Sequence, residues 1–556
     1  MKETHLRALR IISLIMITTL LIPVIVVTAK PKEIRFTYVT TQSTATLDPA
    51  KHRDETESLM VMNLYDPLVY PQPGKSPKPW VAERWEVSPD GMTWTFYIRK
   101  GIKFHDGTEL TAEDVAFSMD RMLRMGKGYS WLWKGVLEPG DIEVLDKYTV
   151  RFHLRKPYGP FLATLVQLFI VNKDLIMANL KPGPYGEFGD YGEEFLSKHD
   201  AGSGPYYIEI YEPGTRYVFR KFEDYWGGWE ENQIDVATVL VVGEEATEVT
   251  MLRKGEADMI EQWVSAETFE ELKKEPGIVV KEDPAPQLFF VSLHNQKPPT
   301  DDVYFRKAIS YAIDYEAINK VVFKGAVQAV GPVPVLMPGH NPNVTVYKRD
   351  LEKAKEYLSK SKYADRVGEF TLEYMYVEYI ESERRIGLII QSNLAELGIK
   401  VKLRPETWAR MTELMAKPET TPHMVAIFHT AKYPSPDSHT YLMFSSKAAG
   451  TYMSCAWYNN SVVDKLLEKA RATIDVEERY RLYGEVQRIV TEDAAILFIA
   501  NPIHRIAYRD WVKGYKYIGI LGYDLVWYNL RIEKEISSLP TAETPLLVAI
   551  KQEYEI

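Results

Sequence analysis

The sequence contains very little cysteine, and this scarcity limits how the protein can be held together. Cys455 is the only cysteine among 556 residues, so no intramolecular disulfide can form. A lipid anchor on a processed N-terminal cysteine is not expected either, because Cys455 lies far along the chain. Stability must then come from buried apolar surface, which a chain of this length can supply in more than one core.

Clustered basic residues and familiar catalytic motifs are missing as well. The formal net charge is −10 and no long basic run is present, which argues against nucleic acid because its phosphates require clustered Lys and Arg. We find no Gly-x-Ser-x-Gly elbow, His-Glu-x-x-His helix or P-loop. We therefore predict no enzyme, no metal site and no cofactor. A secreted hydrolase stays as the alternative, because two carboxylates at the right distance suffice for a glycosidase.

One apolar run approaches membrane length, and it lies at the N-terminus. Lys2, Arg7 and Arg10 precede the run Ile11–Val27, a pattern typical of a secretory signal with cleavage after Ala29. An uncleaved anchor is the alternative, because the run is close to the roughly 18 residues that span a membrane. We expect an exported protein that is soluble after cleavage or held by an uncleaved N-terminal helix.

Strand and helix patterns alternate along the rest of the chain. Period-two or continuous apolar patterns predict strands at residues 34–39, 94–98, 102–104, 206–210 and 288–293. Thr111 followed by Asp114 predicts a capped helix start, and Gly255 predicts a helix end. Helical spacing predicts a further helix around residues 305–312. The fold class is therefore mixed α/β.

Aromatic residues are abundant, at 12% with 35 Tyr and 12 Trp. Most of them are expected to fill cores, while a minority could stack against a ligand, since Tyr and Trp combine an apolar face with a polar tip.

A series of motifs carries a family resemblance. These motifs are Leu47-Asp-Pro-Ala50, Asn63-Leu-Tyr-Asp-Pro-Leu-Val69, Ala82-Glu-Arg-Trp85, Ser88 to Phe96, Arg99 to Thr108, Gly202 to Tyr206, Phe305 to Asp314 and Tyr433-Pro-Ser-Pro-Asp437. Their order resembles that of the extracellular solute-binding proteins of ABC importers, family 5, which bind peptides, nickel or oligosaccharides. Each motif alone is weak, but the likeness covers nearly all of the chain after the leader.

The resemblance implies a periplasmic-binding-protein-like clamshell of type II, cluster C, with two lobes, one carrying an extra domain. The ligand sits between the lobes and favours the closed form. We expect these boundaries: signal peptide or anchor 1–29; core domain of the first lobe 30–67, 203–284 and 511–540; extra domain 68–202; second lobe 285–510; C-terminal tail 541–556.

The sequence departs from the peptide binders of this family at one informative place. The resemblance implies an acid that meets the peptide amine just ahead of an Asp-Pro-Asp-like segment, and Lys432 aligns there. A lysine would repel an ammonium group. Asp437 takes the role if the alignment shifts by a few residues. The arginine of dipeptide binders aligns near Val377, so a standard dipeptide receptor is less expected than a receptor for longer peptides or an oligosaccharide.

The candidate ligand-binding residues are polar or aromatic. They lie in the first loop or at and before this segment, except Trp131, which lies in the extra domain whose loops face the cleft in related proteins. They are Thr41, Gln42, Ser43, Thr44, Trp131, Trp408, His429, Lys432, Tyr433, Ser435 and Asp437. For each one, a structural role in a loop or core is the competing interpretation. We expect a monomer that takes a small polar ligand, an oligopeptide or oligosaccharide, and delivers it to ABC permease subunits. A receptor for a membrane sensor would have the same clamshell.

Overall fold

The computed structural model describes residues 33–72, 75–520 and 523–534. The predicted signal segment at 1–29 and the tail at 541–556 lie outside these residues. The described residues from Arg35 to Lys534 form one compact unit. Among the described residues, no helix combines the length and apolar character needed to cross a bilayer.

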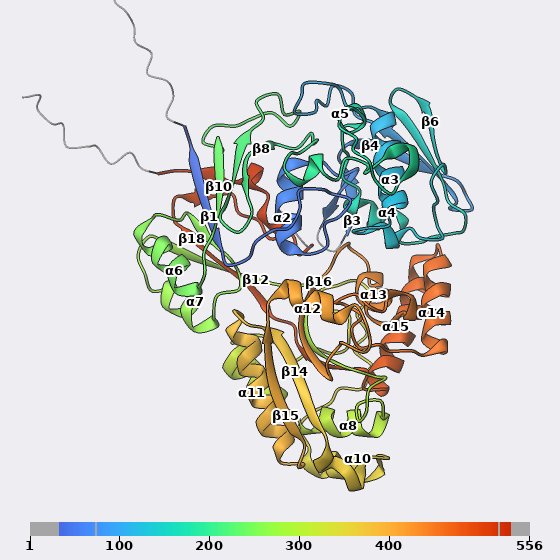
Figure 1. The fold of residues 1–556 in the computed structure, drawn as a ribbon, viewed down its shortest axis with the longest axis vertical. Helices are drawn as coiled ribbons and strands as arrows, with labels where there is room; N and C mark the ends of the chain where they lie inside the picture. Colours follow the sequence, from blue (N-terminus) through green and yellow to red (C-terminus); the bar gives the residue numbers. More distant parts are fainter. Residues whose placement is uncertain (1–32, 73–74, 521–522, 535–556) are drawn as a thin grey trace, which may run out of the picture. The chain divides into compact units, whose positions relative to one another are not determined.

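The first lobe is built on a seven-stranded mixed sheet of order β12-β18-β11-β1-β10-β9-β8. Its strands are β1 (Arg35–Thr40), β8 (Tyr206–Glu212), β9 (Arg216–Lys221), β10 (Val236–Val241), β11 (Met259–Ile260), β12 (Ile278–Pro284) and β18 (Ile503–Arg509). The central strand β1 pairs in parallel with β10 and β11. Helices α6 (Glu245–Lys254) and α7 (Ala266–Leu272) lie beside this sheet (Figure 1). Their Leu252 and Phe269 are buried in one cluster with Val39 of β1.

The second lobe contains a five-stranded sheet of order β15-β14-β16-β13-β17. Its strands are β13 (Gln287–Leu293), β14 (Thr371–Val377), β15 (Lys400–Glu406), β16 (Met424–Thr430) and β17 (Ile496–Ala500). Its helices are α8 (Val303–Ala312), α9 (Tyr315–Ala317), α10 (Leu351–Lys360), α11 (Glu381–Ala395), α12 (Trp408–Met415), α13 (Asp437–Phe444), α14 (Ser461–Ala472) and α15 (Val476–Glu492). Buried strand residues and apolar residues of α8 and α11 form its main core.

A four-stranded antiparallel sheet, β4-β5-β7-β6, forms the middle of the extra domain. The elements are β2 (Val69–Gln72), β3 (Lys75–Pro79), β4 (Ala82–Val87), β5 (Thr93–Ile98), α3 (Ala112–Met125), β6 (Ile142–Asp146), β7 (Thr149–His153), α4 (Phe161–Thr164) and α5 (Lys173–Ala178). Helix α2 (Glu55–Leu64) precedes them, and the short strands β19 (Val512–Lys513) and β20 (Arg531–Ile532) pair near the end of the described chain.

Two crossings join the two large sheets. Residues 284–287 lead from β12 to β13, and residues 500–503 lead from β17 back to β18. Strand β18 therefore belongs to the first sheet, whereas the sequence-based division ended the second lobe only at residue 510. The pairing of β18 with β12 along seven residue pairs explains the difference, because its partner is remote in sequence.

Most local predictions are confirmed by the structure. Helix α3 has the expected capping box between Thr111 and Asp114, and Gly255 ends α6 in the left-handed conformation, with φ of 73°. The strand predicted at residues 102–104 is wrong. Only an isolated bridge joins Lys103 to Glu109, across the turn at His105 and Asp106.

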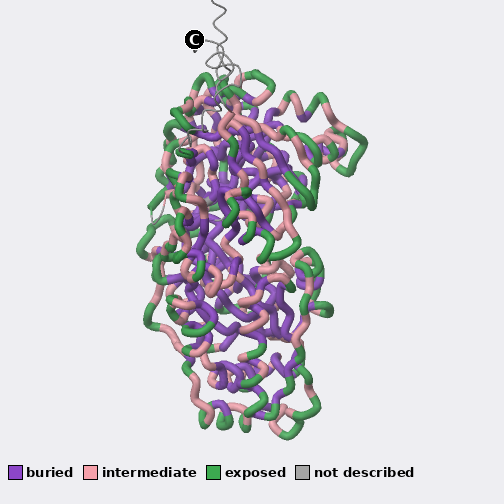
Figure 2. The backbone as a smooth tube through the Cα atoms, turned by 90° about the vertical axis from the view of Figure 1, so that its left-hand side faces the viewer, coloured by how far each residue is buried: buried purple, intermediate pink, exposed green. Residues whose placement is uncertain are grey.

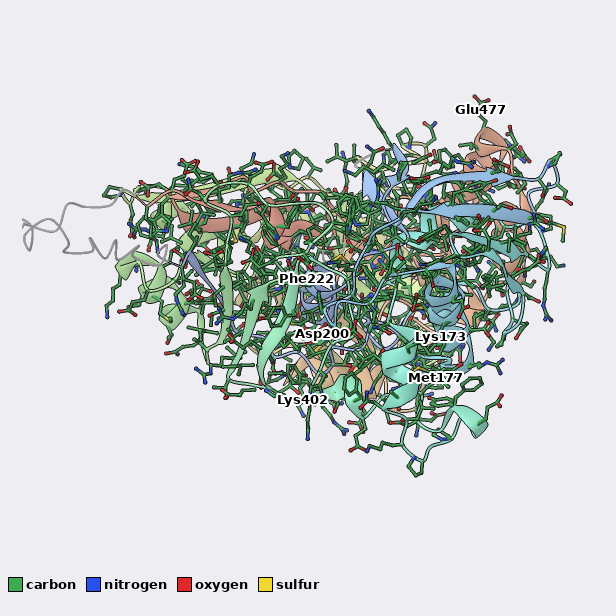
Figure 3. All side chains as sticks on the ribbon, turned by 90° about the horizontal axis from the view of Figure 1, so that it is seen from above. Lys173, Met177, Asp200, Phe222, Lys402 and Glu477 are labelled. Carbon is green, nitrogen blue, oxygen red and sulfur yellow. The ribbon has the colours of Figure 1, made fainter. Side chains whose placement is uncertain are left out.

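His105, which begins that turn, has a structural role. Its Nδ1 pairs with Asp200, its Nε2 lies 2.9 Å from the carbonyl oxygen of Gly204, and its ring meets Phe222 edge-on. Asp200 also accepts a hydrogen bond from the backbone N–H of Ile208 in β8 (Figure 3 labels Asp200 and Phe222). The extra domain is thereby attached to the first sheet.

Buried backbone runs through both lobes, with exposed residues on the outer loops and helix faces (Figure 2). The single cysteine, Cys455, is among the buried residues, and burial raises the pKa of its thiol to about 12.

Candidate functional site

A cavity of about 70 Å³ lies between the two large sheets. Its lining from the first lobe is Gln42, Asp54, Glu55 and Trp263, and its lining from the second lobe is Val377, Tyr379, Ile380, Glu383, Trp408, Phe428, Thr430, Lys432 and Tyr452. Five of these side chains are aromatic, and four are ionisable acids or bases. The cavity therefore combines stacking surfaces with a few charges, as small-molecule sites do.

The first-lobe wall is organised by the N-terminus of α2. Asp54 caps this helix, because its Oδ1 accepts the backbone N–H of Glu57 at 3.1 Å and the hydroxyl of Thr56 at 2.9 Å. Its other oxygen, Oδ2, accepts the indole N–H of Trp408 at 2.9 Å. A helix cap of one lobe is therefore bonded to an aromatic wall of the other.

The second-lobe wall follows from the alternation of β16. Phe428, Thr430 and Lys432 are two residues apart, so their side chains leave the same face of the strand and its extension, and all three line the cavity. Trp263 meets Phe428 edge-on, with ring centroids 5.0 Å apart, which closes this side.

Lys432 is the only cation among the residues that line this cavity. The side chain is buried, with a relative exposure of 1%. Its Nζ lies 5.3 Å from the ring centroid of Tyr452. Within the described part of the chain it forms no ion pair within 4.0 Å. Burial lowers the pKa of Lys432 to about 7, and the attraction of Asp54 and Glu55 only partly opposes this effect.

Glu383 is the buried acid of the second-lobe wall. Its Oε2 accepts the backbone N–H of Val377 at 2.7 Å, and burial raises its pKa to about 8 despite this hydrogen bond. Glu383 is therefore mostly protonated at neutral pH and contributes little negative charge to the cavity.

Three of the eleven predicted residues line the cavity: Gln42, Trp408 and Lys432. Their role in ligand binding stays a prediction. The rest of the first loop is bonded inside its own lobe. The hydroxyl of Thr41 donates to Glu261, Ser43 and Tyr217 exchange a hydrogen bond of 3.0 Å, and the backbone N–H of Thr44 donates to the Tyr217 hydroxyl.

The remaining predicted residues lie away from this cavity. Trp131 contacts the ring of Tyr129 in the extra domain. His429 points from the opposite face of β16 and packs against His439, with ring centroids 4.3 Å apart. Its Nε2 lies 2.8 Å from the carbonyl oxygen of Ser438, and burial lowers the pKa of His429 well below its ordinary value.

Tyr433, Ser435 and Asp437 belong to a buried polar cluster. Asp437 accepts hydrogen bonds from the hydroxyls of Tyr433 at 2.7 Å and Tyr483 at 2.6 Å, and lies 3.3 Å from Arg471. The hydroxyl of Ser435 accepts the backbone N–H of Asp437. Asp437 is therefore the shared acceptor of a buried structural cluster, and it does not line the cavity as Lys432 does.

Sequence reasoning missed most of the cavity wall, although two signals were available. Asp54 followed by Glu57 has the spacing of a helix cap, which marks α2 and its N-terminus. The alternation of β16 pairs Lys432 with Phe428 and Thr430 and separates it from His429 and Tyr433. No local signal identifies Trp263, Glu383 or Tyr452, because only the tertiary fold brings them to the cavity.

Several contacts join the lobes around the cavity. Besides the bond between Trp408 and Asp54, Arg385 of α11 pairs with Glu267 of α7 at 2.8 Å. The amide of Gln167 in the extra domain donates to the carbonyl oxygen of Lys432 at 2.5 Å. The lobes are thus closed upon each other in this structure. Among the described residues, no group of three or more His, Cys, Asp or Glu side chains could hold a metal ion.

Comparison with known proteins agrees with this architecture. Residues 76–451 match the family described as bacterial extracellular solute-binding proteins, family 5 Middle. The dipeptide-binding protein of Escherichia coli K12 is 30% identical over 79% of this chain and 83% of its own.

Among solved structures, an ABC transporter-associated periplasmic binding protein of Helicobacter pylori in complex with the peptide STSA is similar. It has a TM-score of 0.80 and 29% identity, over 90% of this chain and 98% of that one. A dipeptide-binding protein of Pseudoalteromonas sp. SM9913 in complex with Met-Leu has a TM-score of 0.79 and 23% identity, over 90% of this chain and 100% of that one.

The family and these relatives are binding proteins, not enzymes, and share the two-lobed clamshell. This chain belongs to the bacterial extracellular solute-binding proteins of family 5.

Proposed function

We propose that the protein is the extracytoplasmic solute-binding component of an ABC importer. It captures a peptide or an oligosaccharide between its lobes and delivers it to the permease. The cavity lined from both large sheets carries the proposal, because a ligand held there contacts both lobes at once and stabilises their closed arrangement. The peptides bound by the relatives support the first ligand class, and the aromatic walls suit sugar rings as well as peptide side chains.

The geometry also explains how capture and release could be coupled. The crossings at residues 284–287 and 500–503 are the only places where the described chain passes between the large sheets. Rotation at these short segments would separate the two cavity walls without disrupting either sheet. The leader pattern and a cavity lined by one chain support the proposed role as an exported monomer. Light scattering of the purified protein tests the monomer.

A thermal-shift screen tests the ligand class. Purified protein, unfolded and refolded to remove bound solute, is mixed with pools of di- to pentapeptides, oligosaccharides and nickel chelates. A true ligand should raise the melting temperature by an amount that follows RT ln(1 + [L]/Kd). No shift at millimolar concentration in any pool would contradict the proposal.

Mass spectrometry of the same mixtures checks that binding leaves the ligand intact. Recovery of unchanged ligand is expected, because a binding protein returns what it captures. A hydrolysis product that accumulates with time and protein concentration would overturn the assignment as a binding component.

A further inference from the structure

The cavity contains one cation, Lys432, whose ammonium group has no carboxylate in direct contact among the described residues. Both backbone polar groups of Lys432 are hydrogen-bonded. Its N–H donates to the hydroxyl of Ser438 at 2.8 Å, and its carbonyl oxygen accepts the amide of Gln167 at 2.5 Å. The segment is therefore fixed, and the side chain extends into the cavity.

The acids closest to Lys432 are already engaged by other donors. Asp54 accepts hydrogen bonds from three groups, including the indole of Trp408, and Glu55 accepts the amide of Gln262. Neither comes within 4.0 Å of the Lys432 ammonium, as an ion pair would require. Their attraction reaches Lys432 only at longer range.

The other groups around Lys432 do not neutralise it. The remaining titratable neighbours are Glu383 of α11, Tyr379 and Tyr452 on the cavity wall, and His429 and His439 behind it. Burial keeps Glu383 protonated, lowers the pKa of His439 to about 3, and raises that of the Tyr452 hydroxyl. These groups are therefore neutral near pH 7.

We propose that the natural ligand carries a carboxylate and that this carboxylate binds against the Lys432 ammonium. The inference rests on the proposed function, and it specifies the chemical class within it: a peptide with a free terminal carboxylate or an acidic sugar. A ligand carboxylate would supply the missing partner of a desolvated cation.

A single carboxylate fits the site better than other charged groups. A ligand ammonium placed next to Lys432 would experience like-charge repulsion in a water-poor cavity. A doubly charged phosphate would place a second negative charge near Asp54 and Glu55, with no further cation among the lining residues to balance it.

Matched ligands test this proposal on the wild-type protein. The peptide Ser-Thr-Ser-Ala is prepared in four forms: free, N-acetylated, C-amidated, and blocked at both ends. Digalacturonate and its methyl ester form the sugar arm. We expect the forms with a carboxylate, in one arm or the other, to bind at least tenfold more tightly than the amides or ester, measured by calorimetry. Equal or tighter binding of the amide or ester would overturn the proposal.

Proton uptake gives a second readout that needs no variant. At pH 8.5 the empty cavity holds a mostly neutral Lys432, and a bound carboxylate raises the pKa of this lysine and favours its protonation. Calorimetry in two buffers of different ionisation enthalpy should therefore detect uptake of about one proton per ligand. Binding without proton uptake would contradict the proposed contact.

Substitutions at two lysines localise the effect. Lys432→Met should reduce the preference for carboxylate over amide or ester to less than threefold and abolish proton uptake. Lys402→Met, at an exposed lysine of β15, should leave both unchanged.

If no peptide form and no sugar shifts the melting temperature of the wild type, the proposed peptide or oligosaccharide function fails and this inference fails with it. Binding without carboxylate preference overturns only the inference.

Discussion

Two buried cations near the same segment of the chain differ in how their charge is balanced. The guanidinium of Arg471 lies 3.3 Å from the carboxylate of Asp437 and donates a hydrogen bond of 2.7 Å to the hydroxyl of Tyr158. Its Cζ also lies 3.6 Å from the ring centroid of Tyr441. Lys432, five residues before Asp437, has the ring of Tyr452 beside its ammonium group and, among the described residues, no carboxylate within 4.0 Å. The first cation joins the lobes; the second lines the cavity.

The pKa values express this difference. Burial alone would lower the pKa of Arg471, but the combined attraction of Asp437 and the neighbouring tyrosines outweighs it and raises that pKa well above its ordinary value. Burial dominates at Lys432 and lowers its pKa to about 7, because Asp54 and Glu55 are not in direct contact. A structural cation is paired within the protein, whereas a cation at a binding site retains unsatisfied attraction for a ligand.

Removing the anion of the paired site should have the largest effect. Asp437→Asn leaves Arg471 buried without its counterion, and should lower the free energy of unfolding by about 3–5 kcal/mol. Urea denaturation measures this loss. Glu478→Gln, which removes the exposed partner of Arg481, serves as the control and should cost less than about 1 kcal/mol. Equal losses of stability in both variants would show that the buried pair of Arg471 and Asp437 matters no more than an exposed pair.

Removing the unpaired cation should have the opposite effect and stabilise the empty protein. Because the folded protein lowers the pKa of Lys432 from its ordinary 10.5 to about 7, the unfolded chain binds more protons between these pH values. Burial of Lys432 therefore lowers the free energy of unfolding of the wild type by its full amount below pH 7. This loss of stability decreases as the pH rises towards 10.5. Lys432→Met should stabilise the empty protein more at pH 6 than at pH 9, by roughly 2–3 kcal/mol.

Chemical denaturation at both pH values measures this difference, and Lys402→Met provides the control with no change between them. A destabilised Lys432→Met protein at pH 6 would show that the lysine is already satisfied by the protein itself.

The contact between the lobes at the cavity should have a smaller effect. Trp408→Phe keeps an aromatic wall but removes the N–H that Asp54 accepts, which costs the closed form about 1 kcal/mol. Ligand affinity should fall by about fivefold. Trp457→Phe is the matched control, because its indole N–H donates to Thr421 within the second lobe. Fluorescence energy transfer between labels on α3 and α10 should report more open molecules for Trp408→Phe only.

The exposed contact between the lobes should have the smallest effect. Glu267→Gln removes the partner of Arg385 and Lys324, and should weaken ligand binding by less than about 1 kcal/mol. The difference from wild type should disappear in 0.5 M salt, because salt screens exposed pairs. An effect that persists at high salt would show that this pair is as desolvated as the one at Arg471.

Local structure was more predictable from the sequence than the site. The capping box at Thr111, the glycine at the end of α6 and the apolar strand β13 depend on neighbouring residues, and each is recognisable within a short window. The family resemblance then supplied the clamshell, which periodicity alone does not specify.

The cavity was predicted less well because its walls come from distant segments. Gln42, Trp408 and Lys432 were identified, while Trp263 and Glu383 were not. Tyr433 and Asp437 looked equally suitable in sequence, yet they are turned towards Tyr483 and Arg471. The direction of a side chain out of an irregular segment depends on its packing partners, and those partners are remote in sequence.

The shared role of Asp54 has a kinetic consequence. Its Oδ1 continues to cap α2 whether or not Trp408 is present. At this point of the interface, separation of the lobes leaves the helix end intact and exchanges a single N–H···O bond for bonds to water. Neither lobe has to refold before the next encounter. The bond at Asp54 therefore adds little to the barrier to reopening. The other contacts between the lobes, at Arg385, Gln167 and Arg471, and the solute's own contacts set how long a captured solute stays inside.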